Sequence, residues 1–116
     1  MDNKKDNQYY IKKIVTDLEF IIEHTEGLTQ SELEDNELLT DSVMFRLIQI
    51  SENADRLTDN FKNQTSIPWR AVKGMRNRIV HEYGDVDLTV VYDTVHEDLP
   101  ELLHELNKIC KQTVKN

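Results

Sequence analysis

Apolar residues recur at helical spacing along most of the chain. Over residues 6–26 they stand three and four positions apart, at Ile11, Ile14, Val15, Leu18, Ile21 and Ile22. This spacing predicts a helix with one buried face, and Gly27 after it is typical of a helix end. A second series alternates steps of four and three and predicts a long helix over residues 37–62. Its members are Val43, Leu47, Ile50, Ala54, Leu57 and Phe61.

The segment between these two helices, residues 28–36, is mostly polar. Thr29 stands three residues before Glu32, the spacing of a capping box, and could begin a short extra turn of helix. Because few apolar residues are available there, we expect a connection rather than an element of the core.

Two further helices are predicted in the second half of the chain. A polar loop over residues 63–67 precedes Pro68, which suits the first turn of a helix because its missing N–H has no partner there anyway. That third helix should run to about residue 83. Asp87 can cap a fourth helix. Within it Pro100 removes a backbone hydrogen bond, so we expect a kink or a short break near Asp98.

Four helices with short connections predict an all-α fold, an antiparallel four-helix bundle with a bend at the proline of its last helix. The composition agrees, because 3 Gly and 2 Pro supply too few turn signals for an all-β fold of 116 residues. A chain of this length has room for one hydrophobic core, so we expect residues 1–116 to form a single domain. With 38% hydrophobic and 31% charged residues, its outside should be heavily charged.

The remaining composition bears on location and partners. The chain has no apolar run near the length of a membrane span, and its start lacks the apolar region of a secretory signal. Its one cysteine, Cys110, cannot form an internal disulfide, so we expect a cytoplasmic protein. A net charge of −8 argues against nucleic-acid binding by the chain as a whole, because affinity for phosphates comes mostly from Lys and Arg.

The third predicted helix departs from this acidic background, because residues 68–83 include four basic residues and one acidic residue, a local charge of +3. Around the helix, one side holds Trp69, Val72, Arg76, Ile79, Val80 and Tyr83, and a second side holds Arg70, Lys73, Asn77 and His81. An arginine in the middle of an apolar side needs an anion or a route to solvent, because an unpaired buried charge is costly. A cationic stripe on an acidic body can attract one phosphate chain.

The same segment carries a longer motif. It reads IPWRAVKGMRNRIVHEYGDVD, in which Arg76 and Asn77 precede His81 and Tyr83, and it resembles the signature of HepT-type toxins of the HEPN superfamily. The upstream ISENADRL and the downstream LPELLHEL are also similar to that family. The resemblance covers most of the chain from about residue 40 onward.

This resemblance implies a HEPN-like antiparallel bundle that forms a homodimer and acts as the toxin of a type VII HEPN/MNT toxin–antitoxin pair. The Arg-x4-His motifs of two chains would meet across a cleft in a metal-independent endoribonuclease site that cuts messenger or transfer RNA, with Arg76, Asn77 and His81 as catalytic residues. It also implies a partner, a minimal nucleotidyltransferase antitoxin that can transfer AMP to the motif tyrosine, here Tyr83. No cofactor is expected.

The residue types suggest how such a site would work. Attack of the ribose 2′-OH on the adjacent phosphorus would leave a 2′,3′-cyclic phosphate, with His81 as general base or acid, because imidazole exchanges protons near neutral pH. Arg76 would stabilise charge on the phosphate oxygens, and Asn77 would orient His81 or bind the phosphate. Arg76 and His81 are five residues apart, about 140° around a helix, so one straight helix cannot easily place both on one phosphate. A two-fold axis between two chains could place the arginine of one chain and the histidine of the other on the same phosphate.

Other residues would support this chemistry. Those expected to guide the RNA backbone are Arg70, Lys73 and Arg78. Glu52 on the second predicted helix could order Arg76 or His81, although a surface glutamate without such a role is the commoner case. The ring of Tyr83 is on the apolar side of its helix, so it either packs there or exposes its hydroxyl. AMP attached to that hydroxyl would repel RNA.

Other interpretations stay open on the sequence alone. The cationic stripe could be the docking surface of a non-catalytic HEPN module that binds a nucleotidyltransferase or a nucleotide and never cuts RNA. The chain could also be a purely structural bundle. Glu101 and His104 have the Glu-x-x-His spacing of di-iron bundles, but the sequence lacks a second such pair, so no metal centre is expected.

Overall fold

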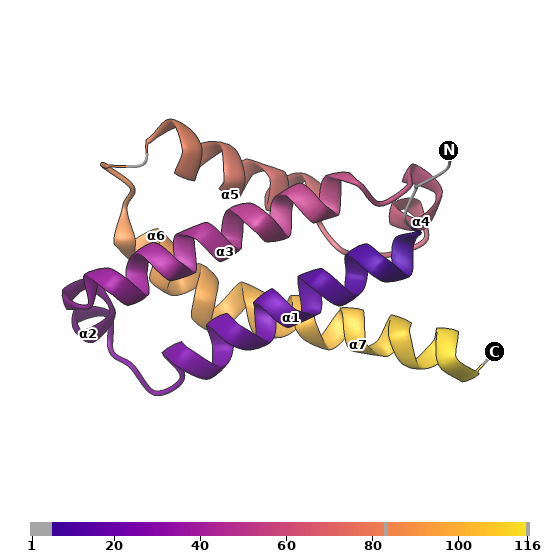
Figure 1. The fold of residues 1–116 in the computed structure, drawn as a ribbon, viewed down its shortest axis with the longest axis horizontal. Coiled ribbons are helices and arrows are strands. Elements are labelled where there is room, and N and C mark those ends of the chain that lie inside the picture. The colour runs from indigo at the N-terminus through magenta and orange to yellow at the C-terminus, as the bar shows by residue number, and fades with distance from the viewer. Residues whose placement is uncertain (1–5, 83, 116) are drawn as a thin grey trace.

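The computed structural model describes residues 6–82 and 84–115, and every regular element in these ranges is a helix. Four long helices form the frame: α1 (Asn7–Thr25), α3 (Glu37–Asp55), α5 (Trp69–His81) and α7 (Leu99–Lys115). Successive long helices run antiparallel; α5 packs on α3, α3 on α1, and α1 on α7 (Figure 1). The all-α class predicted from the sequence is confirmed. No helix within the described ranges combines the length and the apolarity that crossing a bilayer requires.

The core consists of the apolar positions that the helical spacing marks. Side chains with no solvent exposure come from all four long helices. They include Ile14 and Leu18 on α1, Val43 on α3, Ile79 on α5 and Leu106 on α7. Because each long helix contributes at least one of them, the packing of these side chains fixes how α5 sits on α3.

An ion pair ties α1 to α3 at the edge of this core. Asp17 on α1 is only 5% exposed and accepts a 2.7 Å hydrogen bond from Nη1 of Arg46 on α3. The Arg46 guanidinium also lies over the ring of Phe20, 3.8 Å from its centroid. Burying a carboxylate is costly unless a partner compensates its charge, so this arginine allows an aspartate on the core side of α1.

The connection between α1 and α3 contains a short helix, α2 (Gln30–Asp35). Gly27 follows α1 in the left-handed conformation, with a φ of 79°, which glycine adopts at little cost. The capping box forms, because the Thr29 hydroxyl accepts from the Glu32 N–H and the Glu32 carboxylate accepts from the Thr29 N–H. Leu33 is completely buried, so the expectation that this segment adds nothing to the core is wrong.

The long helix predicted over residues 37–62 is broken in two. After α3 the chain makes a turn, and α4 (Asp59–Asn63) starts behind Thr58, whose hydroxyl caps it. The side chain of Asn7 holds this turn from α1: its Oδ1 accepts from the Thr58 N–H at 3.0 Å, and its Nδ2 donates to the Thr58 hydroxyl at 3.1 Å. One continuous helix does not form because this contact gives the Thr58 N–H a partner outside the helix.

Contacts at both ends fix the position of α5. Trp69, its first residue, donates from the indole N–H to the Thr65 hydroxyl at 2.9 Å. Near the other end the fully buried Ile79 anchors the helix in the core, and His81 is the last helical residue. These bounds are close to the predicted residues 68–83.

The last predicted helix is divided near its proline. Asp87 caps α6 (Leu88–Asp93), and a π-helical turn, η1 (Thr94–Asp98), joins α6 to α7. In this wider turn the N–H of Leu99 reaches back five residues for its acceptor carbonyl. The expected irregularity near Asp98 is a widened turn in which the backbone stays helical, not a break, and it lies directly before the first turn of α7, where Pro100 is tolerated.

Candidate functional site

Arg76 is held from two helices. Its Nε atom lies 3.2 Å from Oε1 of Glu52 on α3, and its Nη1 donates a 3.1 Å hydrogen bond to Oδ1 of Asn77, the next residue of α5. The Nε atom is shielded from solvent, and its contact with Glu52 is an ion pair without hydrogen-bond alignment. The rest of the side chain is partly exposed. The guanidinium is therefore oriented and can still be reached from solvent.

This arrangement suits anion binding better than it suits stability. With 34% and 46% of the Arg76 and Glu52 side chains exposed, water screens the pair, so it contributes little to folding. A guanidinium has five N–H donors, and the two contacts engage only Nε and Nη1. The remaining donors fit the oxygens of a phosphate or a carboxylate.

Glu52 shares one face of α3 with two exposed apolar residues. Leu38, Phe45 and Glu52 are seven residues apart and therefore share one face of α3. The two apolar members of this face are 84% and 58% exposed, respectively. An exposed apolar strip thus leads along α3 to the Glu52–Arg76 pair. Of the two roles that the sequence allowed for Glu52, contact with Arg76 is the one observed, rather than the commoner isolated surface position.

The predicted apolar side of α5 is only partly buried. Ile79 is completely buried, and Trp69 and Val72 are half-buried against the core. Val80, expected on the same side, is 42% exposed. Consecutive helical residues are about 100° apart, so with Ile79 pointing into the core Val80 turns toward solvent. Val80 therefore lies at the exposed edge of the predicted side, opposite the edge that Ile79 occupies.

His81 is exposed at the end of α5. The half-buried Asn77 uses its amide oxygen to accept from Arg76, so the described contact of Asn77 is with the arginine and not with His81. The residues expected to guide RNA are all exposed on the same helix; they are Arg70, Lys73 and Arg78. Tyr83, the expected AMP acceptor, lies outside the described residues.

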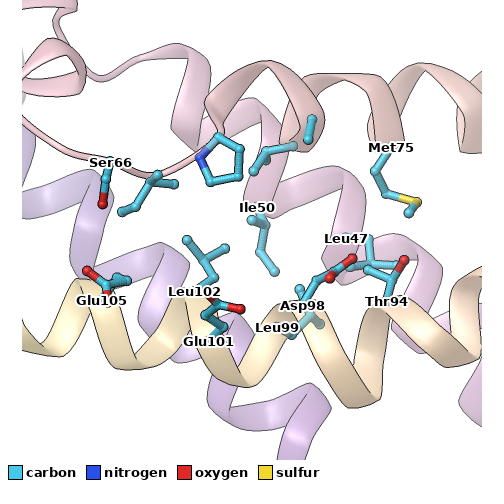
Figure 2. Close-up of a pocket in the computed structure, with 14 residues that line it drawn as sticks. Leu47, Ile50, Ser66, Met75, Thr94, Asp98, Leu99, Glu101, Leu102 and Glu105 are labelled. Atoms are coloured by element: carbon cyan, nitrogen blue, oxygen red, sulfur yellow. The ribbon is translucent and has the colours of Figure 1, made fainter.

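An apolar groove lies between α3, α5 and the η1–α7 segment. Its volume is about 310 Å³, and Figure 2 shows Ile50, Met75 and Leu102 pointing into it from three helices. Acidic side chains also line it from η1 and α7; they are Asp98, Glu101 and Glu105. These carboxylates would repel phosphate. None of the predicted site residues that the structure describes lines this groove.

A second groove, of about 430 Å³, opens between α1 and α3, and Glu52 lines it. Tyr9, Tyr10 and Lys13 contribute from α1, opposite Arg56, the residue that follows the end of α3. The sequence interpretation assigned no role to these four residues. Arg56 belongs to the ISENADRL segment. For the three residues of α1 the only signal is a tyrosine pair close to a lysine, which is too common to indicate a site without knowledge of which helix faces them.

Metal-ligand side chains do not gather within the described ranges, where no group of three or more His, Cys, Asp or Glu could hold an ion. Glu101 and His104, the pair with di-iron spacing, are both exposed on α7. Glu101 lines the apolar groove instead.

Comparison with known proteins covers most of the chain. Residues 14–109, which include Glu52, Arg76 and His81, match the family described as Ribonuclease HepT-like. A Thermococcus cleftensis protein named Probable ribonuclease HepT is 29% identical over 109 residues, 93% of this chain and 99% of that protein. A provisionally named RNase of Caldanaerobacter subterraneus subsp. tengcongensis is 28% identical over 104 residues, 89% of this chain and 93% of the relative. No solved structure matches the chain at a significant level.

A further relative is longer than this chain. The Methanocaldococcus jannaschii protein carries a name that combines gamma-glutamylcyclotransferase with a provisional RNase. It is 31% identical over 114 residues, which cover 97% of this chain and 51% of that protein. The chain therefore spans about half of this relative, and the similarity concerns that half alone.

Proposed function

This chain belongs to the HepT-like ribonuclease family and is an endoribonuclease, and we propose that it cuts RNA at a site shared by Arg76 and His81 of two protomers. The observation that carries the proposal is the state of Arg76, which Glu52 and Asn77 hold while part of its side chain stays open to solvent. Five residues later on the same helix His81 is exposed. The two side chains supply a phosphate-binding cation and a proton-transfer group.

The proposed reaction uses the substrate as its own nucleophile. His81 of one protomer removes the proton of the ribose 2′-OH, whose oxygen bonds to the adjacent phosphorus while the bond from phosphorus to the 5′ oxygen breaks. The second His81, protonated, supplies a proton to that leaving oxygen. The products are a 2′,3′-cyclic phosphate and a 5′-hydroxyl end. Arg76 binds the non-bridging oxygens, where negative charge develops, and no step needs a metal ion or a cofactor.

Two protomers are needed because of where the two residues lie on α5. Five helical positions separate their directions by about 140°. A two-fold axis near α5 turns the histidine of one protomer toward the arginine of the other. The exposed Leu38, Phe45 and Val80 support such a homodimer, because they are apolar and lie on α3 and α5, the helices that carry the Glu52–Arg76 pair.

The rest of the cationic helix positions the substrate in this proposal. Arg70, Lys73 and Arg78 are exposed on α5 and would bind phosphates on either side of the cut. Asn77 would keep the Arg76 guanidinium in plane with the scissile phosphate through its 3.1 Å hydrogen bond. The proposed substrate is single-stranded RNA without a strict sequence preference, because contacts to phosphates alone carry no sequence information.

As the toxin of a type VII pair, the protein would be silenced by a minimal nucleotidyltransferase antitoxin. The proposed acceptor is Tyr83, two residues after His81. Its hydroxyl oxygen would bond to the α-phosphorus of ATP and pyrophosphate would leave, so that AMP adds a negative phosphate beside the cationic helix. That charge opposes RNA binding, and cleavage stops without unfolding.

RNA cleavage by the purified protein in excess chelator tests the proposal. The parent should cut single-stranded RNA into products with 2′,3′-cyclic phosphate ends. His81→Ala should lower the rate by about 10² to 10⁴-fold. His104→Ala, at an exposed histidine on α7, should leave it unchanged. A parent protein that cuts no RNA in chelator contradicts the proposal, and this is the result that a non-catalytic docking module predicts. A His81→Ala protein that cuts like the parent also contradicts it.

A further inference from the structure

The groove between α1 and α3 shares a wall with the proposed active site. Its volume is about 430 Å³. Glu52 belongs to both, since it lines the groove and its carboxylate lies 3.2 Å from Nε of Arg76. We call this hollow the tyrosine groove; its other lining residues are Tyr9, Tyr10, Lys13, Gln49, Asn53 and Arg56. An RNA strand bound at Arg76 would pass beside it.

Two aromatic rings form one wall of the tyrosine groove. Tyr9 is 39% exposed, and Tyr10 meets its ring edge-on, with centroids 5.1 Å apart and ring planes at 84°. This edge contact restricts the tilt of both rings, so the groove has a pre-set aromatic surface. Nucleobases stack on such surfaces whatever their identity, because every base has a π face.

The opposite wall, on α3, carries amide groups. Asn53 is only 4% exposed, and its Nδ2 donates a 3.0 Å hydrogen bond to the Gln49 carbonyl. This bond fixes the amide and leaves its oxygen as an acceptor. The half-buried Gln49 adds a second side-chain amide. Side-chain amides are frequent partners of the polar edges of bases.

The charges of the tyrosine groove favour a phosphate. Lys13 and Arg56 both line it, and Nζ of Lys13 lies over one face of the Tyr9 ring, 5.6 Å from its centroid. Its one acidic lining residue, Glu52, is offset by Arg76. An aromatic ring, fixed amides and two cations in one hollow match the parts of a nucleotide: the face of the base, its edge and the phosphate.

We propose that the tyrosine groove binds one nucleotide of the RNA strand next to the scissile phosphate. The base stacks on Tyr9 with its edge toward Asn53, and the flanking phosphate lies between Lys13 and Arg56. This assignment rests on the proposed function, because Arg76 must hold the scissile phosphate for the neighbouring nucleotide to reach the groove. A free mononucleotide has the same chemistry, but only an RNA strand occupies Arg76 and the groove together.

RNA binding by Tyr9 variants tests the assignment. The probe is a short labelled single-stranded RNA, and His81→Ala in every protein prevents cutting. Tyr9→Ala should weaken binding by about tenfold, whereas Tyr9→Phe, which keeps the ring, should weaken it by less than about twofold. Lys12→Ala is the matched control, because Lys12 is exposed on α1 and does not line the groove. Parental affinity in a folded Tyr9→Ala protein overturns the assignment.

A double-mutant cycle between protein and RNA makes the test specific to stacking. Removing the single base next to the cut should weaken binding of the parent by about tenfold, and binding of the Tyr9→Ala protein by less than about twofold. A base removed far from the cut is the control and should have the same effect on both proteins. If the losses from the protein and RNA changes simply add, the base does not stack on Tyr9 and the assignment fails.

Two further outcomes separate this inference from the proposed function. A parent protein that cuts no RNA overturns both the proposed function and the groove assignment. If the parent cuts RNA and the Tyr9→Ala protein has the same KM, the groove assignment alone is overturned. AMP, titrated as the probe of a free mononucleotide, should compete with RNA and bind more weakly than the strand. Tyr9-dependent AMP binding without competition would make the groove a separate nucleotide site and overturn its assignment to RNA.

Discussion

The Nε atom of Arg76 on α5 lies 3.2 Å from a carboxylate oxygen of Glu52 on α3. Because this contact crosses between two helices, the direction of the guanidinium depends on a residue 24 positions away, outside the Arg-x4-His motif. In the proposed site Glu52 would therefore act through Arg76, as a positioning residue.

Substitution of Glu52 should lower turnover more than it lowers affinity. Glu52→Gln removes the charge that holds Nε, so kcat should fall by about tenfold, or about 1.4 kcal/mol of transition-state stabilisation, while KM changes little. Glu52→Asp, which keeps the charge, should recover part of the rate. Steady-state kinetics on one RNA measure kcat and KM for each protein. Asp55→Asn changes an exposed carboxylate on the same helix; an equal loss there would mean that α3 acts through its overall charge.

Adding inactive chains should lower the activity of parent chains by forming mixed dimers with them. If cleavage requires both His81 residues of a dimer, a mixed dimer of parent and His81→Ala chains is inactive. After subunit exchange with an equal amount of His81→Ala protein, about half of the parent chains remain in parental dimers, so activity should fall by about half. Cleavage at a fixed amount of parent chain measures this. Unchanged activity, with mixed dimers verified by native mass spectrometry, would contradict a shared site.

The apolar strip on α3 should control dimer formation. Phe45 is 58% exposed and Leu38 is 84% exposed, so a charge at either position costs the monomer little but opposes burial in an interface. Phe45→Glu should weaken dimerisation by at least about tenfold, with an unchanged melting temperature of the monomer. Sedimentation velocity measures the dissociation constant. Lys12→Glu introduces the same residue on the exposed surface of α1, and dimers should survive it.

Removal of the Asp17 carboxylate should destabilise the fold. Asp17 is 5% exposed and pairs with Arg46 at 2.7 Å, so Asp17→Ala leaves a partly buried guanidinium without its partner. The free energy of unfolding should fall by about 1–3 kcal/mol. Urea denaturation measures it. Glu19→Ala, at an exposed position on the same helix, should change stability by less than about 0.5 kcal/mol.

The cationic residues of α5 should appear in the salt dependence of RNA binding. Each phosphate contact on single-stranded RNA contributes about 0.7 to the slope of log affinity against log salt. Lys73→Ala should therefore reduce that slope by about 0.7, and Arg70→Ala by a similar amount, because both residues are exposed on α5. Titrations at several salt concentrations give the slope. A slope that stays at the parental value would place the RNA away from this helix.

The signal for α5, which has Ile79 as its one buried residue, is Pro68 before it rather than a repeat of buried positions. Apolar spacing is enough to predict α1 and α3, because each repeats its buried residues every three or four positions. It does not predict the break between α3 and α4, since Leu57 and Phe61 continue the pattern through it. The break depends on Asn7, which is 51 positions from Thr58 in the sequence and meets it only in the folded chain. Spacing within a segment carries no information about such a contact.

The candidate site, too, is predicted from the sequence only in part. An arginine in an apolar stripe indicates that Arg76 needs an anion, but the sequence leaves open which carboxylate provides it. Packing of α5 on α3 selects Glu52. The tyrosine groove was not predicted at all, because Tyr9 and Asn53 become neighbours of one hollow only when α1 lies along α3. Motif residues are thus visible in the sequence, whereas the residues that surround them follow from tertiary packing.

Glu52 and Arg76 belong to one chain, so in the proposed dimer a newly made copy would already carry its half of the site and would lack only a second copy. While most copies are single, the number of dimers grows with the square of their concentration, and a twofold rise in abundance gives about a fourfold rise in cutting. If the site needs two copies, the ion pair that each copy already holds leaves protein concentration in control of cutting: a few copies would cut little RNA, and a burst of synthesis would cut much more.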